Sequence, residues 1–212
     1  MPKIKNKAYR EFIDSGVINT IDDGIIRKAL HNITGKHRLE GRALLICLYY
    51  TGARPAEVLK MVARDITKQG GYVVIRVQAA KRGLSRLIYI QYKYGLIREL
   101  YAYAISLYPD QLLFYNYKGD YKRLRKTKKG SIVEYVSHTE KLKYHVEKWF
   151  NGVIEGSITP YFLRHNRFSK MAEMGASDNE IRLIKGAKRM DSISHYIHLS
   201  KKTAKSAARR IN

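Results

Sequence analysis

Arg54, Arg164 and Tyr196 are the residues of this chain whose types suit chemistry on a phosphodiester. Arg54 lies in the segment TGARPAE, Arg164 in TPYFLRH and Tyr196 in SHYIHLS. Two guanidinium groups can neutralise the nonbridging oxygens of a phosphate by bidentate hydrogen bonds while a phenolate oxygen attacks the phosphorus. This chemistry requires neither a metal ion nor another cofactor, so none is expected.

Arg54 stands directly before Pro55, where a helix is expected to begin. Proline disfavours the helical region for the residue before it, so the side chain of Arg54 should project from the turn. Glu57 follows three residues later, on the same side of the helix. It could orient Arg54 by a charged hydrogen bond, or it could complement the helix dipole as an acidic residue of the first turn.

Arg164 belongs to a second predicted helix start. Thr159 suits the N-cap and Pro160 the first helical position, which leaves Tyr161 and Arg164 three residues apart on one face. Both side chains should therefore reach the same ligand. A capping box at 177–180 (SDNE) predicts the start of the next helix.

Lys81 lies between two predicted strands, in the segment AKRGLS. A hairpin loop that contains glycine can lift such a lysine out of the sheet and toward a ligand. A hairpin lysine is more often a solubilising charge, so Lys81 taken alone indicates little.

Composition indicates one compact globular domain with a polyanionic partner. The 212 residues are 45% hydrophobic and carry 41 Lys and Arg against 18 Asp and Glu, a formal net charge of +23. Nucleic acid is the favoured partner. An anionic membrane is the alternative, but the longest apolar stretch, 43–50, is too short to span a bilayer. We therefore expect a cytoplasmic protein that associates with nucleic acid and has no membrane partner; DNA association is implied only by the family resemblance given below. Cys47 is the single cysteine, which excludes an internal disulfide.

Periodicity predicts an α+β fold that is mostly helical, with a small three-stranded antiparallel sheet against a helical bundle. The expected helices lie near 7–15, 22–34, 38–50, 93–105, 136–151, 160–174, 178–185 and 191–209, and the expected strands over 62–67, 72–79 and 86–91. The basic stretch 115–131 is interpreted as a loop, either an arm on DNA or a solvated segment.

The order Arg54, Lys81, Tyr161-x-x-Arg164, Tyr196 resembles the catalytic domain of the tyrosine recombinase (phage-type integrase) family. The specific pieces are the YTGxRxxE box, the TPxxLRH box and the YxHxS ending, and Lys81 with Arg86 resembles the family's β-hairpin lysine segment.

The resemblance covers roughly 38–200 and implies a catalytic domain there, with a short helical extension at 1–37 and a basic tail at 201–212. The family usually carries a further DNA-binding domain before the catalytic one. Residues 1–37 are too few for it, so the chain is expected to be either a fragment or a minimal enzyme.

Two positions depart from the usual pattern. Tyr161 stands where most of the family has histidine, a variant that resembles integrases of archaeal plasmids and viruses. Ala187 stands where a Leu-Gly-His segment supplies a further histidine or tryptophan, and Lys185 or Lys188 could fill the role.

The resemblance implies attack by Tyr196, charge neutralisation by Arg54 and Arg164, and protonation of the leaving 5′-hydroxyl by Lys81. Tyr161 or His165 would position the phosphate or the proton network. The product is a 3′-phosphotyrosyl bond that another strand can reverse without ATP.

The implied partners are double-stranded DNA with attachment-site sequences and further copies of the chain, as a dimer or tetramer on DNA. The implied function is that of a site-specific recombinase or integrase. Two alternatives stay open: a DNA-binding protein of the same fold without strand cleavage, and a relaxing enzyme of the type IB topoisomerase kind.

Overall fold

The computed structural model describes residues 21–79, 83–119, 121–127 and 130–189. The helices expected near 7–15 and 191–209 lie outside these ranges. Within the described residues, no helix combines the length and the apolar composition needed to cross a bilayer.

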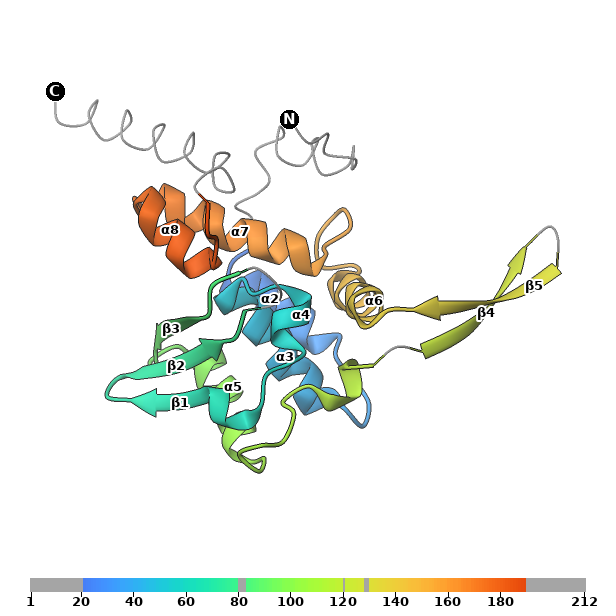
Figure 1. The fold of residues 1–212 in the computed structure, drawn as a ribbon, viewed down its shortest axis with the longest axis horizontal. Coiled ribbons are helices and arrows are strands. Elements are labelled where there is room, and N and C mark those ends of the chain that lie inside the picture. Colours follow the sequence, from blue (N-terminus) through green and yellow to red (C-terminus); the bar gives the residue numbers. More distant parts are fainter. Residues whose placement is uncertain (1–20, 80–82, 120, 128–129, 190–212) are drawn as a thin grey trace, which may run out of the picture.

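The described chain is mainly helical, with a three-stranded sheet and a separate two-stranded ribbon (Figure 1). The helices are α2 (Asp23–His31), α3 (Arg38–Thr51), α4 (Pro55–Val58), α5 (Gly95–Ile105), α6 (His138–Phe150), α7 (Pro160–Glu173) and α8 (Asp178–Lys185). The strands are β1 (Ile66–Gln69), β2 (Tyr72–Val77), β3 (Arg86–Gln91), β4 (Tyr121–Thr127) and β5 (Gly130–Val136), and the short 3₁₀ turns are η2 (Ala63–Asp65) and η3 (Tyr115–Tyr117). The predicted fold class is confirmed.

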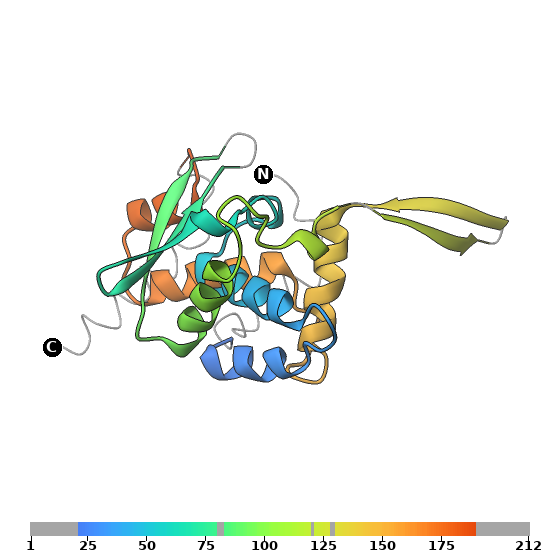
Figure 2. The same ribbon diagram turned by 90° about the horizontal axis from the view of Figure 1, so that it is seen from below.

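Helix α3 is the central buried element, as its apolar sequence predicts. It contacts α2, α4, α5 and α7, and Figure 2 shows it enclosed by other helices. Cys47 lies within it, fully buried, and burial raises the pKa of its thiol to about 12. The helix ends at Gly52, whose φ of 56° is a left-handed conformation that favours glycine. The chain then turns directly into Arg54 and α4.

Strands β1, β2 and β3 form an antiparallel sheet in that order. Val73, Ile75 and Val77 of β2 and Ile88 and Ile90 of β3 are buried in the same core as the helices. One face of the sheet therefore packs on the helical body.

The predicted strand at 62–67 starts later than expected. Val62 forms only an isolated bridge with Leu112, and η2 separates it from β1. The Asp65 carboxylate accepts a hydrogen bond of 3.0 Å from the Val62 backbone N–H. This local bond closes a turn where the apolar pattern alone favoured an extended strand.

The predicted loop at 115–131 is wrong, because most of its length forms η3 and the β4–β5 ribbon. The antiparallel register runs from Tyr121 opposite Val136 to Thr127 opposite Gly130. β-branched and aromatic residues in SIVEYV favour a strand, and they outweigh the charge that indicated a loop. In Figures 1 and 2 the ribbon extends away from the helical body.

The predicted helix starts are confirmed by their caps. The Thr159 hydroxyl accepts from the Phe162 backbone N–H at 3.2 Å, and Ser177 accepts from the Glu180 N–H at 3.3 Å. Ser137 caps α6 in the same way, which places the start of that helix after the ribbon rather than at 136. These caps fix where α7 presents Arg164 and where α8 begins.

Candidate active site

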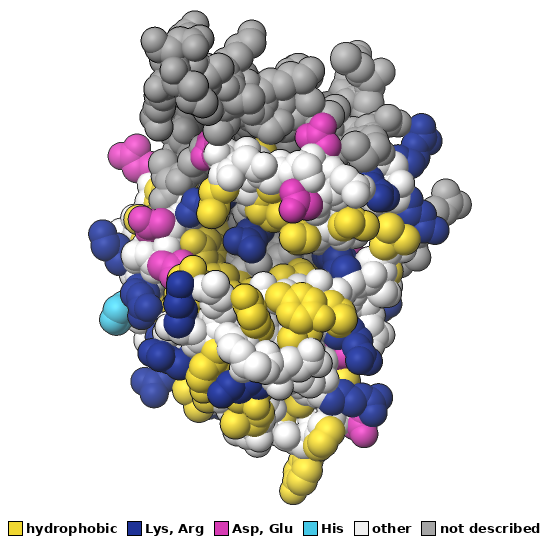
Figure 3. Space-filling view, turned by 90° about the vertical axis from the view of Figure 1, so that its left-hand side faces the viewer, with side chains coloured by type: hydrophobic (Ala, Val, Ile, Leu, Met, Phe, Trp, Pro, Cys, Tyr) yellow, Lys and Arg dark blue, Asp and Glu magenta, His cyan; other side chains and the backbone are white. Residues whose placement is uncertain are grey.

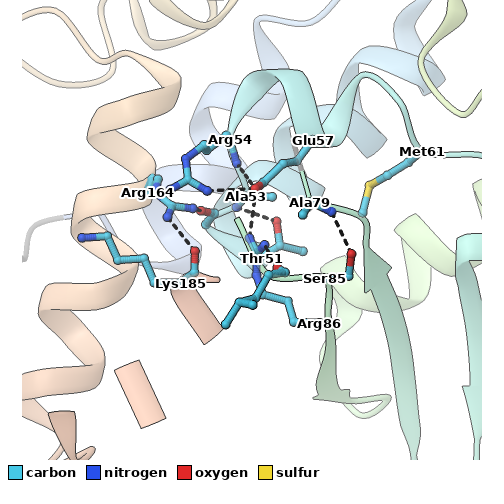
Figure 4. Close-up of polar contacts among 12 residues, drawn as sticks. Thr51, Ala53, Arg54, Glu57, Met61, Ala79, Ser85, Arg86, Arg164 and Lys185 are labelled. Atoms are coloured by element: carbon cyan, nitrogen blue, oxygen red, sulfur yellow. Dashed lines mark hydrogen bonds and ion pairs between the residues drawn. The ribbon is translucent and has the colours of Figure 1, made fainter. Parts of the chain in front are cut away.

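Arg54 and Glu57 are joined at the start of α4 (Figure 4). The Arg54 Nη1 donates to Glu57 Oε1 at 2.9 Å, and the Arg54 backbone N–H donates to Oε2 at 2.8 Å. Glu57 therefore caps the helix and also orients the guanidinium, so the two interpretations of this residue both hold. The Glu57 side chain is fully buried, whereas that of Arg54 is 35% exposed. Arg54 can thus still reach a ligand in solvent.

Arg86 of β3 holds Glu57 from the other side. Its Nη2 lies 3.0 Å from Glu57 Oε2, and its side chain is 6% exposed. Burial alone would raise the pKa of Glu57, but hydrogen bonds from Arg86 and from the Arg54 backbone, with the charges of both guanidiniums, hold it below the ordinary value. Glu57 is therefore ionised at neutral pH and fixes two guanidiniums at once.

Arg164 of α7 is anchored by backbone carbonyls. It is 4% exposed, its Nη1 donates to the Gly52 carbonyl, and its Nη2 donates to the Lys185 carbonyl at 2.8 Å. Its guanidinium carbon lies 4.9 Å from the centre of the Phe168 ring. These contacts tie α7 to the ends of α3 and α8, and they hold the charge in one place before any ligand arrives.

The end of the β2–β3 hairpin approaches the same cluster. The Leu84 N–H donates to the Gly186 carbonyl at 3.1 Å, and a Cβ added to Gly83 would lie 3.6 Å from Arg54 Nη1. Lys81 itself lies outside the described residues, as does Tyr196. The described end of this loop, at Gly83, lies close to Arg54.

Lys185 is the described lysine that lies within this cluster. It is 8% exposed, and burial, followed by the charges of Arg164 and Arg54, lowers its pKa to about 8. Lys188 is exposed, and Ala187 is buried. Of the two lysines considered for the role of the missing histidine, the structure places Lys185 near both arginines.

Tyr161 and Arg164, predicted on one face of α7, differ in their exposure to solvent. Tyr161 is 53% exposed and lines a pocket of about 450 Å³ with Pro55, His165 and Lys143, whereas Arg164 is buried. The spacing of three residues places them on adjoining parts of α7, and only one of them faces the interior. His165 and Tyr161 instead border the pocket next to the arginine cluster.

The cluster is strongly cationic. Arg54 and Arg86 contact the Glu57 carboxylate, and Lys185 lies close enough to Arg164 and Arg54 for their charges to lower its pKa. Figure 3 shows one face of the molecule, on which basic side chains lie along both edges with a few acidic side chains among them. Within the described residues, no group of His, Cys, Asp and Glu could hold a metal ion. The arrangement suits an anion such as a phosphate, which would be bound by preorganised guanidiniums.

Arg86 is a residue of the site for which the sequence indicated no role beyond the resemblance to the hairpin segment. The signal was present in the alternation of β3, because Ile88 and Ile90 are buried and Arg86 precedes them on the same face. A basic residue on a buried face requires a charged partner.

Residues 21–203 match the model of the phage integrase family. The chain belongs to this family. The chain is also similar to the tyrosine recombinase XerD of Staphylococcus epidermidis, which is 24% identical over 183 residues, or 85% of this chain and 57% of XerD.

Solved structures show the same integrase-family fold. A structure described as the XerH site-specific recombinase bound to difH substrate in a pre-cleavage complex gives a TM-score of 0.60 at 20% identity, over 89% of this chain and 53% of XerH. XerA recombinase gives 0.59 at 16% identity, over 91% of this chain and 62% of XerA. The chain thus spans little more than half the length of XerD and XerH.

Proposed function

We propose that this protein is a site-specific recombinase that cleaves and rejoins DNA through a 3′-phosphotyrosyl intermediate. The observation that carries the proposal is the buried cluster in which Glu57 fixes Arg54 while the Gly52 and Lys185 carbonyls fix Arg164. Two guanidiniums held in this way suit the pentacoordinate charge of a phosphoryl transition state. The match to the phage integrase family supports the same reaction.

In the proposed step, the Tyr196 phenolic oxygen forms a bond to phosphorus as the bond from phosphorus to the 5′ oxygen breaks. The phenolic proton passes to a nearby base, for which His165 is the candidate, and the 5′ oxygen takes a proton from Lys81. Attack by a 5′-hydroxyl reverses the step and restores the tyrosine. Lys185 adds positive charge beside the arginines, and Tyr161 borders the bound strand.

The division into an extension at 1–37, a catalytic domain at 38–200 and a basic tail at 201–212 is part of this proposal, as is a homo-oligomer on double-stranded DNA. The net charge of +23 supports the DNA partner. The XerH structure, described as a complex with difH substrate, supports a duplex with attachment-site sequence. The resemblance to integrases of archaeal plasmids and viruses stays a prediction.

A covalent-trapping assay tests the proposed function. DNA sites selected by binding from a random library are built into nicked suicide duplexes and incubated with wild type, Tyr196→Phe and Arg164→Ala in excess chelator. We expect a protein–DNA adduct on a denaturing gel with wild type and none with either variant. An unchanged adduct with Tyr196→Phe would refute the assigned nucleophile. Tight DNA binding without any adduct would favour a protein of this fold that does not cleave.

A further inference from the structure

We propose that the β4–β5 ribbon is an arm that enters a groove of the DNA duplex beside the cleavage site. This inference rests on the proposed function, because the duplex must be held at the arginine cluster. It adds a second contact surface, separate from the residues that act on the scissile phosphate.

The shape of the ribbon fits a groove. Seven residues of β4 pair with seven of β5, and the ribbon extends away from the helical body in two perpendicular views (Figures 1 and 2). At about 3.3 Å per residue it is roughly 23 Å long. The major groove of B-DNA, about 12 Å wide, admits a two-stranded ribbon. An isolated ribbon is only marginally stable in water, so a partner that covers it would also stabilise it.

The charge of the ribbon is distributed over both of its faces. Because alternate residues of a strand belong to opposite faces, Lys122 and Lys126 fall on one face, and Arg123 and Arg125 on the other. Glu134, opposite Arg123 in the register, is the single acidic residue of the two strands. A ribbon that lay flat on a polyanion would need cations on one face. Cations on both faces suit a groove, which has phosphates on both walls.

Double-stranded DNA fits this surface better than a second copy of the chain. The lysines and arginines of β4 would oppose one another if two ribbons paired edge to edge along that strand, and such charges commonly prevent edge pairing. The same charges attract phosphate oxygens. The partner is therefore the duplex rather than another ribbon.

The base of the ribbon adjoins the candidate site. β5 continues through the Ser137 cap directly into α6. Thr139 and Lys143 of α6 line the pocket that also contains Pro55 and Tyr161. Pro55 follows Arg54 in the chain, so a duplex held by Arg54 would lie within reach of the ribbon.

The test compares two charge-matched variants. The ribbon variant carries Lys122→Gln, Arg123→Gln, Arg125→Gln and Lys126→Gln, and the control carries Lys28→Gln, Lys36→Gln, Arg38→Gln and Arg98→Gln at exposed residues of the body. Both lose the same charge. Affinity for the selected duplex is measured from 50 to 400 mM salt, and hydroxyl-radical footprints are recorded at saturation.

If the ribbon occupies a groove, the slope of log K against log salt falls by about 3 to 4 in the ribbon variant, at roughly 0.9 per lost phosphate contact, and by less than about 1 in the control. The footprint shortens on one side of the cleavage site, while adduct formation at saturating DNA persists. The double variant Arg123→Gln/Arg125→Gln, a milder change to the fold, loses about half as much slope.

Equal slopes and equal footprints in the two four-residue variants would overturn the inference. So would loss of self-association with an unchanged slope, because the ribbon would then bind a second copy. Failure of the proposed function is distinguishable, since it appears in wild type as the absence of a Tyr196-dependent adduct.

Discussion

Glu57 orients Arg54, and Arg86 in turn holds Glu57. The Glu57–Arg86 pair is buried, with the nearest atoms 3.0 Å apart. Removal of one partner from such a pair leaves a buried charge without compensation. In the proposed reaction, Arg86 would therefore be a positioning residue that acts on the phosphate through Glu57 and Arg54.

Arg86→Met should lower the free energy of unfolding by about 3 to 5 kcal/mol. Under conditions where the variant stays folded, it should slow adduct formation by about 10- to 100-fold with little change in DNA affinity, because Arg54 loses its alignment. Urea unfolding and single-turnover trapping measure the two effects. Arg64→Met, in the exposed pair with Asp110, is the control and should cost less than about 1 kcal/mol. An unchanged trapping rate in Arg86→Met would contradict the positioning role.

Lys185 should make stability depend on pH. Its pKa falls from 10.5 to about 8 in the folded protein, so the unfolded chain binds more protons between these values. The cost of the buried charge is fully present below pH 8 and is relieved as pH rises toward 10.5. The total is on the order of 3 kcal/mol.

The difference in the free energy of unfolding, Lys185→Met minus wild type, should therefore be more favourable to the variant at pH 7 than at pH 10. Urea unfolding of both proteins at intervals from pH 7 to 10 measures this change. Lys188→Met, at an exposed lysine, should keep the pH dependence of wild type. Parallel curves for wild type and Lys185→Met would rule out the buried cation.

At this scale, the sequence predicted residues whose role follows from local spacing. Arg54 before Pro55 and Thr159 at its N-cap were read correctly, because both depend on a few consecutive residues. The contact between Arg86 and Glu57 joins residues 29 apart, and it exists only when the hairpin reaches α4. The burial of Lys185 likewise requires α7 and the hairpin to cover the end of α8, which no local pattern encodes.

Among the elements, the turn from α3 into α4 has a strict backbone requirement. Gly52 has a φ of 56°, and a Cβ there would lie 3.1 Å from the Phe168 ring and 3.3 Å from Arg167. Its carbonyl also accepts from Arg164. The turn therefore couples the end of the central helix to the second guanidinium.

Gly52→Ala should cost about 1 to 2 kcal/mol from the left-handed conformation, with a further loss from the close contacts. It should also reduce adduct formation, because displacement of the turn moves the carbonyl that holds Arg164. Gly70→Ala is the matched control, since Gly70 has a φ of 54° and open space around it. Gly70→Ala should lose stability but keep the wild-type rate of adduct formation. Equal rates of adduct formation in Gly52→Ala and Gly70→Ala would disprove the coupling.

Elements with strong local signals were predicted, and those decided by competing signals were not. The capped helices α7 and α8 begin where Thr159 and Ser177 indicated. The β4–β5 ribbon was missed because basic charge and strand-forming residues occupy the same segment, and charge suggested a loop. The two strands form backbone hydrogen bonds with each other, so the ribbon forms without packing against the core.

The whole molecule carries a net charge of +23, which should act in opposite directions on folding and on binding. Self-repulsion destabilises the compact state at low ionic strength, and salt screens it. Between 50 and 200 mM salt, the thermal midpoint of the free protein should therefore rise. DNA affinity should fall by about 10³- to 10⁵-fold if six to ten phosphates are contacted.

Thermal unfolding of the free protein and fluorescence anisotropy with the selected duplex measure these two trends. Potassium glutamate in place of chloride checks for effects specific to the anion. An affinity that did not change with salt would contradict a phosphate-dominated interface, whatever the behaviour of the thermal midpoint.

The two arginines differ in how easily substitution can dislodge them. Arg54 depends on the Glu57 carboxylate, which a single substitution removes. Arg164 depends on the carbonyls of Gly52 and Lys185, which every amino acid supplies. The side chain at position 185 is therefore free to vary over evolution without cost to the anchor of Arg164, whereas position 57 is not. In a deep mutational scan that reads folding stability, position 185 should tolerate substitution and position 57 should not.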